Sequence, residues 1–279
     1  NVLPPVTPAI QALPAVNFEQ STAAFEADPA VGQLLATAGV PPPSSLVSEA
    51  QARQVLGQQF AILGSWFAQN TFGPNFIVFT AMADGTFTIS EDGSSDPNGR
   101  DGMERGTYTW DPVTGAFTAT VQVDTNNQNG VSHAPRPITI TVTGNNFEEN
   151  AGGGTEITPF TRVVDTTAPV DLLVGAWRFD NTDGPGTLAI LTLFENGTFV
   201  LVTDEAAPSS DGIERGTYSV APNGDVTFTR IIDTSATSGF FDPATPGPVV
   251  ENVVVSGDTM TITDSGGSPL PGTRIRPPQ

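Results

Sequence analysis

From about residue 64 to the C-terminus, apolar and polar residues alternate with a period of two, and turn-forming residues recur about every eight to twelve positions. A period of two is typical of a β-strand, whose successive side chains point to opposite faces. The pattern predicts two successive sets of eight strands, at 64–68, 75–82, 86–91, 103–110, 116–123, 137–142, 146–149 and 156–164, and at 175–179, 187–194, 198–204, 213–220, 225–232, 249–255, 259–263 and 272–276.

The second set of strands repeats the first. The block Asp-Gly-Met-Glu-Arg-Gly-Thr-Tyr, from Asp101 to Tyr108, returns with Ile in place of Met from Asp211 to Tyr218. Such a repeat indicates one structural module used twice. Asp-Gly and Asn-Gly pairs between strands supply the positive φ angles of tight hairpins, so consecutive strands are expected to be antiparallel neighbours.

Eight short strands joined by hairpins can close into an up-and-down barrel, which leaves no unpaired edge. The predicted fold class is therefore all-β, with two tandem eight-stranded antiparallel up-and-down barrels preceded by an extended segment and short helices. The predicted boundaries are 1–18 for the extended segment, 19–62 for the helical segment, 63–166 for the first barrel and 170–279 for the second.

The extended segment at 1–18 is rich in proline, which excludes a helix there. Its apolar side chains are too many for a solvated linker, and a disordered terminus is the alternative interpretation. We expect these side chains to contact a neighbouring subunit: Val2, Leu3, Val6, Ile10, Leu13 and Val16. Two candidate helices follow, within 19–38 and at about 48–63.

A Gly-x-Trp motif opens each predicted barrel, as Gly-Ser-Trp at Trp66 and Gly-Ala-Trp at Trp177. This motif resembles the signature of the lipocalins and the wider calycin group. In that group the tryptophan closes one end of the barrel beneath an arginine from late in the domain, and Arg162 and Arg274 stand where that arginine is expected. The resemblance covers residues 63–276 and implies lipocalin-like barrels, although the C-terminal helix usual in that group is missing.

The repeated Glu-Arg pair places opposite charges on opposite faces of a strand. If the face of Tyr108 points inward, Glu104 is buried and requires a cation, for which Arg162 is the natural candidate. The same argument joins Glu214 to Arg274. A core ion pair is the simpler interpretation. In the functional interpretation, the glutamate anchors a polar ligand or acts as an acid with a raised pKa.

Interior side chains offer a second function, the binding of a small hydrophobic ligand, as the resemblance to lipocalins also implies. If a cavity exists, its expected lining is Phe79, Phe87, Glu104, Tyr108, Phe117, Phe199, Glu214 and Tyr218. An eight-stranded barrel is only just wide enough for side chains to fill it, so a filled core is the alternative. A glycoside hydrolase is a third interpretation, and it needs Glu104 or Glu214 to face a cleft with a nearby aspartate.

Two further features bear on metal sites and catalysis. The acidic loop after the third strand carries oxygen ligands at close spacing, as Ca²⁺ prefers: Asp92, Asp96, Asn98 and Asp101. Clusters of Asp, Asn and Gly commonly form turns, so we expect no cofactor, with calcium as the alternative. The single histidine, His133, has no counterpart in the second module, and we expect a solvated side chain there.

The strands at 75–82 and 187–194 are apolar on both faces, and a barrel interior covers only one face of each. The N-terminal helices, the other module or another subunit must cover the remaining face. We expect the helices to cover one of these two strands.

Thirty acidic residues stand against ten basic ones, all arginine, and the net charge is −20. This charge disfavours binding to nucleic acid or to an anionic membrane surface. No apolar run approaches the roughly 20 residues of a membrane span. Lysine-free acidic β-repeats with polar turns are typical of a bacterial surface or matrix protein. The sequence therefore favours a non-enzymatic extracellular structural, assembly or adhesion protein that self-associates through residues 1–18.

Overall fold

The computed structural model describes Gln58 and residues 60–69, 76–93, 101–126, 130–154, 156–164, 172–182, 184–235, 238–241, 247–263 and 267–277. The extended segment with its six contact candidates lies outside the described residues, and so does the first candidate helix. Where the periodicity predicts the end of the second helix, residues 60–62 form a turn. Both barrels belong to one compact unit, Gln59–Gln279.

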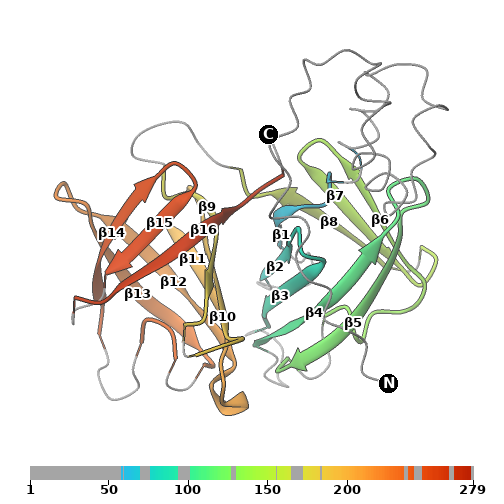
Figure 1. Ribbon diagram of the computed structural model, residues 1–279. Helices are drawn as coiled ribbons and strands as arrows, with labels where there is room; N and C mark the ends of the chain where they lie inside the picture. Colours follow the sequence, from blue (N-terminus) through green and yellow to red (C-terminus); the bar gives the residue numbers. More distant parts are fainter. Residues whose placement is uncertain are drawn as a thin grey trace, which may run out of the picture. The chain divides into compact units, whose positions relative to one another are not determined.

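The first module is a closed barrel in which each strand is antiparallel to the next (Figure 1). The last strand returns to the first, with Trp66 opposite Arg162, and this pairing closes the barrel. Its strands are β1 (Gly64–Gln69), β2 (Phe76–Ala81), β3 (Thr86–Asp92), β4 (Gly102–Trp110), β5 (Ala116–Asp124), β6 (Ile138–Thr143), β7 (Asn146–Ala151) and β8 (Glu156–Arg162).

The second module repeats this barrel and closes in the same way, with Trp177 opposite Arg274. A short 3-10 helix, η4 (Pro208–Ser210), lies between its third and fourth strands. The strands are β9 (Gly175–Asp180), β10 (Leu188–Leu193), β11 (Thr198–Asp204), β12 (Gly212–Val220), β13 (Asp225–Asp233), β14 (Val249–Ser256), β15 (Thr259–Thr263) and β16 (Pro269–Ile275). All sixteen predicted strands are present, and the predicted fold class is confirmed.

Alternation along the strands directs one row of side chains into each barrel. In the first barrel Phe79 stacks on Phe87, with ring centroids 6.0 Å apart, and meets Phe117 edge-on at 5.9 Å. In the second barrel Phe199 meets Phe228 edge-on at 5.1 Å. These rings are almost completely buried and fill the interior near the tryptophan end of each barrel.

The second apolar face of β2 and of β10 lies in a third buried cluster, to which both barrels contribute. Its buried members are Phe76, Val78, Met82, Met103, Leu188, Ile190, Val200, Val202 and Ile213. The expectation that N-terminal helices cover one of these strands is therefore wrong for the described residues, because each barrel covers the outer face of the other. This arrangement removes two apolar sheet faces from water at once.

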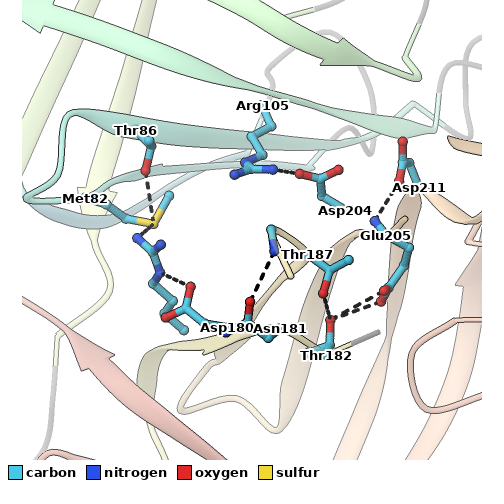
Figure 2. A network of polar contacts seen from close by, with 12 residues as sticks. Met82, Thr86, Arg105, Asp180, Asn181, Thr182, Thr187, Asp204, Glu205 and Asp211 are labelled. Atoms are coloured by element: carbon cyan, nitrogen blue, oxygen red, sulfur yellow. Dashed lines mark hydrogen bonds and ion pairs between the residues drawn. The ribbon is translucent and has the colours of Figure 1, made fainter. Parts of the chain in front are cut away.

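Two ion pairs flank this shared cluster, and each joins one copy of the repeat to the other. Arg105 on β4 pairs with Asp204 on β11 (Figure 2), and Arg215 on β12 pairs with Asp92 on β3. The two arginines are the repeated Arg of the Glu-Arg motif, and the two aspartates end equivalent strands. The outward-facing arginine of each Glu-Arg motif thus forms an ion pair between the barrels.

Candidate functional site

One end of each barrel is closed by the predicted tryptophan and arginine. The guanidinium of Arg162 lies 3.9 Å from the centre of the Trp66 ring, and that of Arg274 lies 3.9 Å from the Trp177 ring. Each arginine also donates to backbone carbonyls just before β1 or β9, for example Arg274 to the Val174 oxygen at 2.8 Å. Burial lowers the pKa of Arg162 to about 10, which still leaves it charged at neutral pH. The predicted closure is present in both copies.

The predicted core ion pairs of Glu104 with Arg162 and of Glu214 with Arg274 are wrong. Both glutamates are fully buried, as expected from an inward Tyr108 face. However, Glu104 accepts from the backbone N–H and the hydroxyl of Ser132. Arg162 and Arg274 contact the tryptophan rings and backbone carbonyls at one end of each barrel. The glutamates lie farther along the barrel interior, beneath a loop.

Glu214 is satisfied by the same kind of loop in the second barrel. Its two oxygens accept from the backbone N–H groups of Phe240 and Phe241, at 2.9 and 3.0 Å. A glycine with positive φ, Gly130 or Gly239, touches the carboxylate in each copy, and a Cβ atom there would overlap it. In each barrel the glutamate therefore anchors a loop at the edge of the end opposite the tryptophan.

The buried carboxyl of Glu214 predicts a pH dependence of stability. Burial raises its pKa to about 8, from 4.5, against the opposing effect of the Phe240 and Phe241 N–H groups. Between these values the folded protein holds a proton that the unfolded chain has lost. This group alone should lower the free energy of unfolding by about 1.4 kcal/mol per pH unit as pH rises from about 5 to 8. In urea unfolding across this range, Glu214→Gln should remove that slope, and parallel curves for the two proteins would contradict the assignment.

The residues predicted to line a cavity mostly pack against one another. Tyr108 and Tyr218 donate their hydroxyls to the carbonyls of Met82 and Phe194, at 3.2 and 2.8 Å. Burial raises the pKa of Tyr108 far above its usual value. None of the eight predicted residues lines either of the two cavities described next. They form the filled part of the barrels.

A cavity of about 680 Å³ occupies the end of the second barrel opposite Trp177. Its position follows from the inward rows of the strands, which run from the tryptophan end through Phe199 to this open end. The apolar part of the lining comprises Phe179, Ala189, Leu201, Phe240, Ile262, Pro269 and Leu270, and the polar part Thr182, Thr203, Glu205, Ser210, Ser238, Gly239, Glu251 and Ser268. Figure 2 shows Thr182 beside the Glu205 carboxylate, to which it donates at 3.3 Å.

The equivalent end of the first barrel holds a smaller cavity, of about 360 Å³. A cross-strand pair also differs there, since Ile77 and its partner Ala68 stand where the second barrel has Ala189 and Phe179. Glu91, Glu149 and Glu156 are among its lining residues, and burial followed by the Glu156 charge raises the pKa of Glu149 to about 7.

The sequence did not single out the residues that line these cavities. Aligning the two repeats gives no clear signal, because Ala189 and Phe179 in the second copy replace Ile77 and Ala68 in the first. The aromatic residues drew the prediction to the wrong end of the barrel, since large apolar side chains are more often core than cavity lining.

The proposed calcium ligands are only partly described. Asp96 and Asn98 lie outside the described residues. Asp92 is paired with Arg215 across the contact between the barrels. Burial, and then the nearby Asp92 charge, raises the pKa of Asp101. The described part of this loop thus serves the joint between the barrels, and calcium binding stays a prediction.

Neither comparison with known proteins identifies a relative. No model of a protein family matches the chain, and no curated protein matches it. The resemblance to lipocalins consequently rests on the Gly-x-Trp motif and the closed barrels alone.

Proposed function

We propose that the protein is a non-enzymatic binding protein whose second barrel takes a small molecule at its open end. The observation that supports this proposal is the cavity of about 680 Å³, which lies within the size range of ligand sites in proteins. Glu104 and Glu214 line neither cavity and are engaged by loops, so the geometry gives no support to their use in glycoside hydrolysis.

The lining of the cavity indicates the chemical class of the ligand. One wall is apolar, and the polar groups include the carboxylates of Glu205 and Glu251 together with several hydroxyls. Neither lysine nor arginine is among the described residues that line the cavity. A protein of net charge −20 also attracts cations and repels anions. The best fit is a molecule with an apolar body and an amine or another hydrogen-bond donor.

The cavity proposal predicts that filling the space abolishes binding. Dodecylamine and dodecanoate, which share one hydrocarbon chain length, would be titrated against the full chain in competition with Nile red fluorescence. We expect the amine to bind more tightly than the acid and Ala189→Phe to weaken its binding at least tenfold. Glu251→Gln should reduce the preference for the amine.

The first barrel supplies the matched control. Ile77→Phe makes the equivalent change in the smaller cavity and should leave binding of the amine within twofold of that of the unmodified protein. Unchanged binding by the Ala189→Phe variant, with the barrel still folded, would show that the cavity is not the site. A native mass spectrum of the purified protein would show any ligand that it already carries.

An assembly or adhesion role is the second candidate, and the shared cluster between the barrels favours it. Buried apolar side chains and two arginine–aspartate ion pairs hold the two barrels together, and such a unit can serve as the subunit of an assembly. In this proposal the apolar residues at 1–18 contact a neighbouring subunit, and the same native mass spectrum would show the oligomer. An extracellular or bacterial cell-surface location suits either role. Among the described residues, no helix combines the length and apolar character needed to cross a bilayer.

A further inference from the structure

Three side chains with metal-binding atoms meet beside the Ser132 loop of the first barrel. Glu104, Asp124 and His133 each offer one such atom within 4.8 Å of the other two. The His133 Nε2 atom lies 3.3 Å from the Asp124 Oδ2 atom. Ser132 holds the buried Glu104 carboxylate, and the next residue in the loop is His133. The loop that is anchored on the glutamate thus carries the only histidine of the chain to the acidic pair.

In the second barrel, an arginine and not a histidine lies beside the same acidic pair. Glu214 and Asp233 face each other across β12 and β13, as Glu104 and Asp124 do across β4 and β5. Arg230 donates to Asp233 at 2.7 Å, and its charge also acts on Glu214.

In the first barrel a valine replaces this arginine. Val121 lies opposite Gly106, just as Arg230 lies opposite Gly216. The first barrel has both carboxylates and an imidazole, with a valine at the position of the guanidinium.

We propose that the first barrel binds a divalent transition-metal ion through Glu104, Asp124 and His133, where the second barrel uses Arg230. Imidazole nitrogen and carboxylate oxygen bind Zn²⁺ at about 2.0–2.2 Å in a tetrahedral arrangement, so the ligand atoms of one ion lie about 3.3–3.6 Å apart. The His133 Nε2 and Asp124 Oδ2 atoms already have this separation, and binding requires the Glu104 carboxylate to move closer to them. The side chains of Asp124 and His133 are 32% and 40% exposed, which leaves room for this movement and for entry of the ion.

The surroundings of Glu104 support a ligand role. Its hydrogen bonds with Ser132 orient the carboxylate. Metal ligands in proteins are commonly oriented by such hydrogen bonds. The imidazole favours Zn²⁺ over Ca²⁺, which prefers ligand sets made of oxygen. This site is separate from the second-barrel cavity, so either proposal can fail without the other.

Zn²⁺ titration of the chelator-treated full chain tests the site. Calorimetry should show one ion bound per chain, and the imidazole resonances of the single histidine should shift with the same stoichiometry. His133→Ala should weaken binding at least tenfold. Val121→Arg, which restores the arrangement of the second barrel, should weaken it to a similar extent while the protein stays folded.

Asp258→Asn is the control, because it removes an exposed carboxylate that pairs with Arg276 at the surface. It should leave the Zn²⁺ affinity unchanged, which separates the site from weak binding to an acidic surface. Imidazole resonances that do not move with Zn²⁺, or equal affinities in the unmodified and His133→Ala proteins, would overturn the proposal. The contact between His133 and Asp124 would then be an ion pair only.

Discussion

Replacing Gly106 or Gly216 by alanine is expected to destabilise the protein by about 3 kcal/mol or more. Both glycines follow the register shift at the repeated Glu-Arg pair, where the neighbouring strand comes very close. A Cβ atom at Gly106 would overlap the backbone carbonyl of Thr120, and one at Gly216 would overlap that of Thr229. Because these obstacles are backbone atoms, the strands themselves would have to separate.

Gly144→Ala is the matched control for this prediction. Gly144 has a φ of +60° but nothing within 4 Å of an added Cβ atom, so its replacement meets only backbone strain of about 1–2 kcal/mol. Urea unfolding of the three variants would compare their free energies. A cost at Gly106 no larger than that at Gly144 would show that strand contact is not the reason for the glycine.

Arg215→Ala is expected to cost about 3–5 kcal/mol, because it leaves the Asp92 carboxylate buried without its charge partner. The Asp92 side chain has no exposed surface, and Arg215 is only 24% exposed. The guanidinium also lies 4.9 Å from the centre of the Phe76 ring. The loss therefore combines an uncompensated charge with packing at the joint between the barrels.

A double-mutant cycle separates these two contributions. The variant Arg215→Ala/Asp92→Asn should be more stable than Arg215→Ala alone, since it lacks the buried charge of the Asp92 carboxylate. Arg276→Ala is the surface control, because its partner Asp258 is 53% exposed, and its loss should stay under about 1 kcal/mol. Equal losses for the Arg215 and Arg276 variants would contradict a buried pair at the joint.

Each residue shared by the two copies of the repeated block has a structural role. The methionine or isoleucine after its first glycine lies in the cluster between the barrels, the glutamate anchors the loop, and the arginine joins the barrels. The second glycine permits close strand contact, and the tyrosine hydroxyl binds a hairpin carbonyl. Retention of an outward arginine in both copies was a signal for an interface that the sequence interpretation did not use.

The sequence by itself determined the sixteen strands and the two barrels, which depend on short-range alternation and on hairpin turns that a single chain displays directly. The closure of the barrels by Trp66 and Trp177 beneath late arginines was implied by the resemblance to lipocalins. Tertiary structure decided which partner each charge found, because Glu104 and Arg162 share a barrel but lie at different depths within it. It also decided that the barrels cover each other, and that space remains at the open end of the second one. Both outcomes depend on how side chains from distant strands fill a common volume, and the order of residues along one strand does not specify that volume.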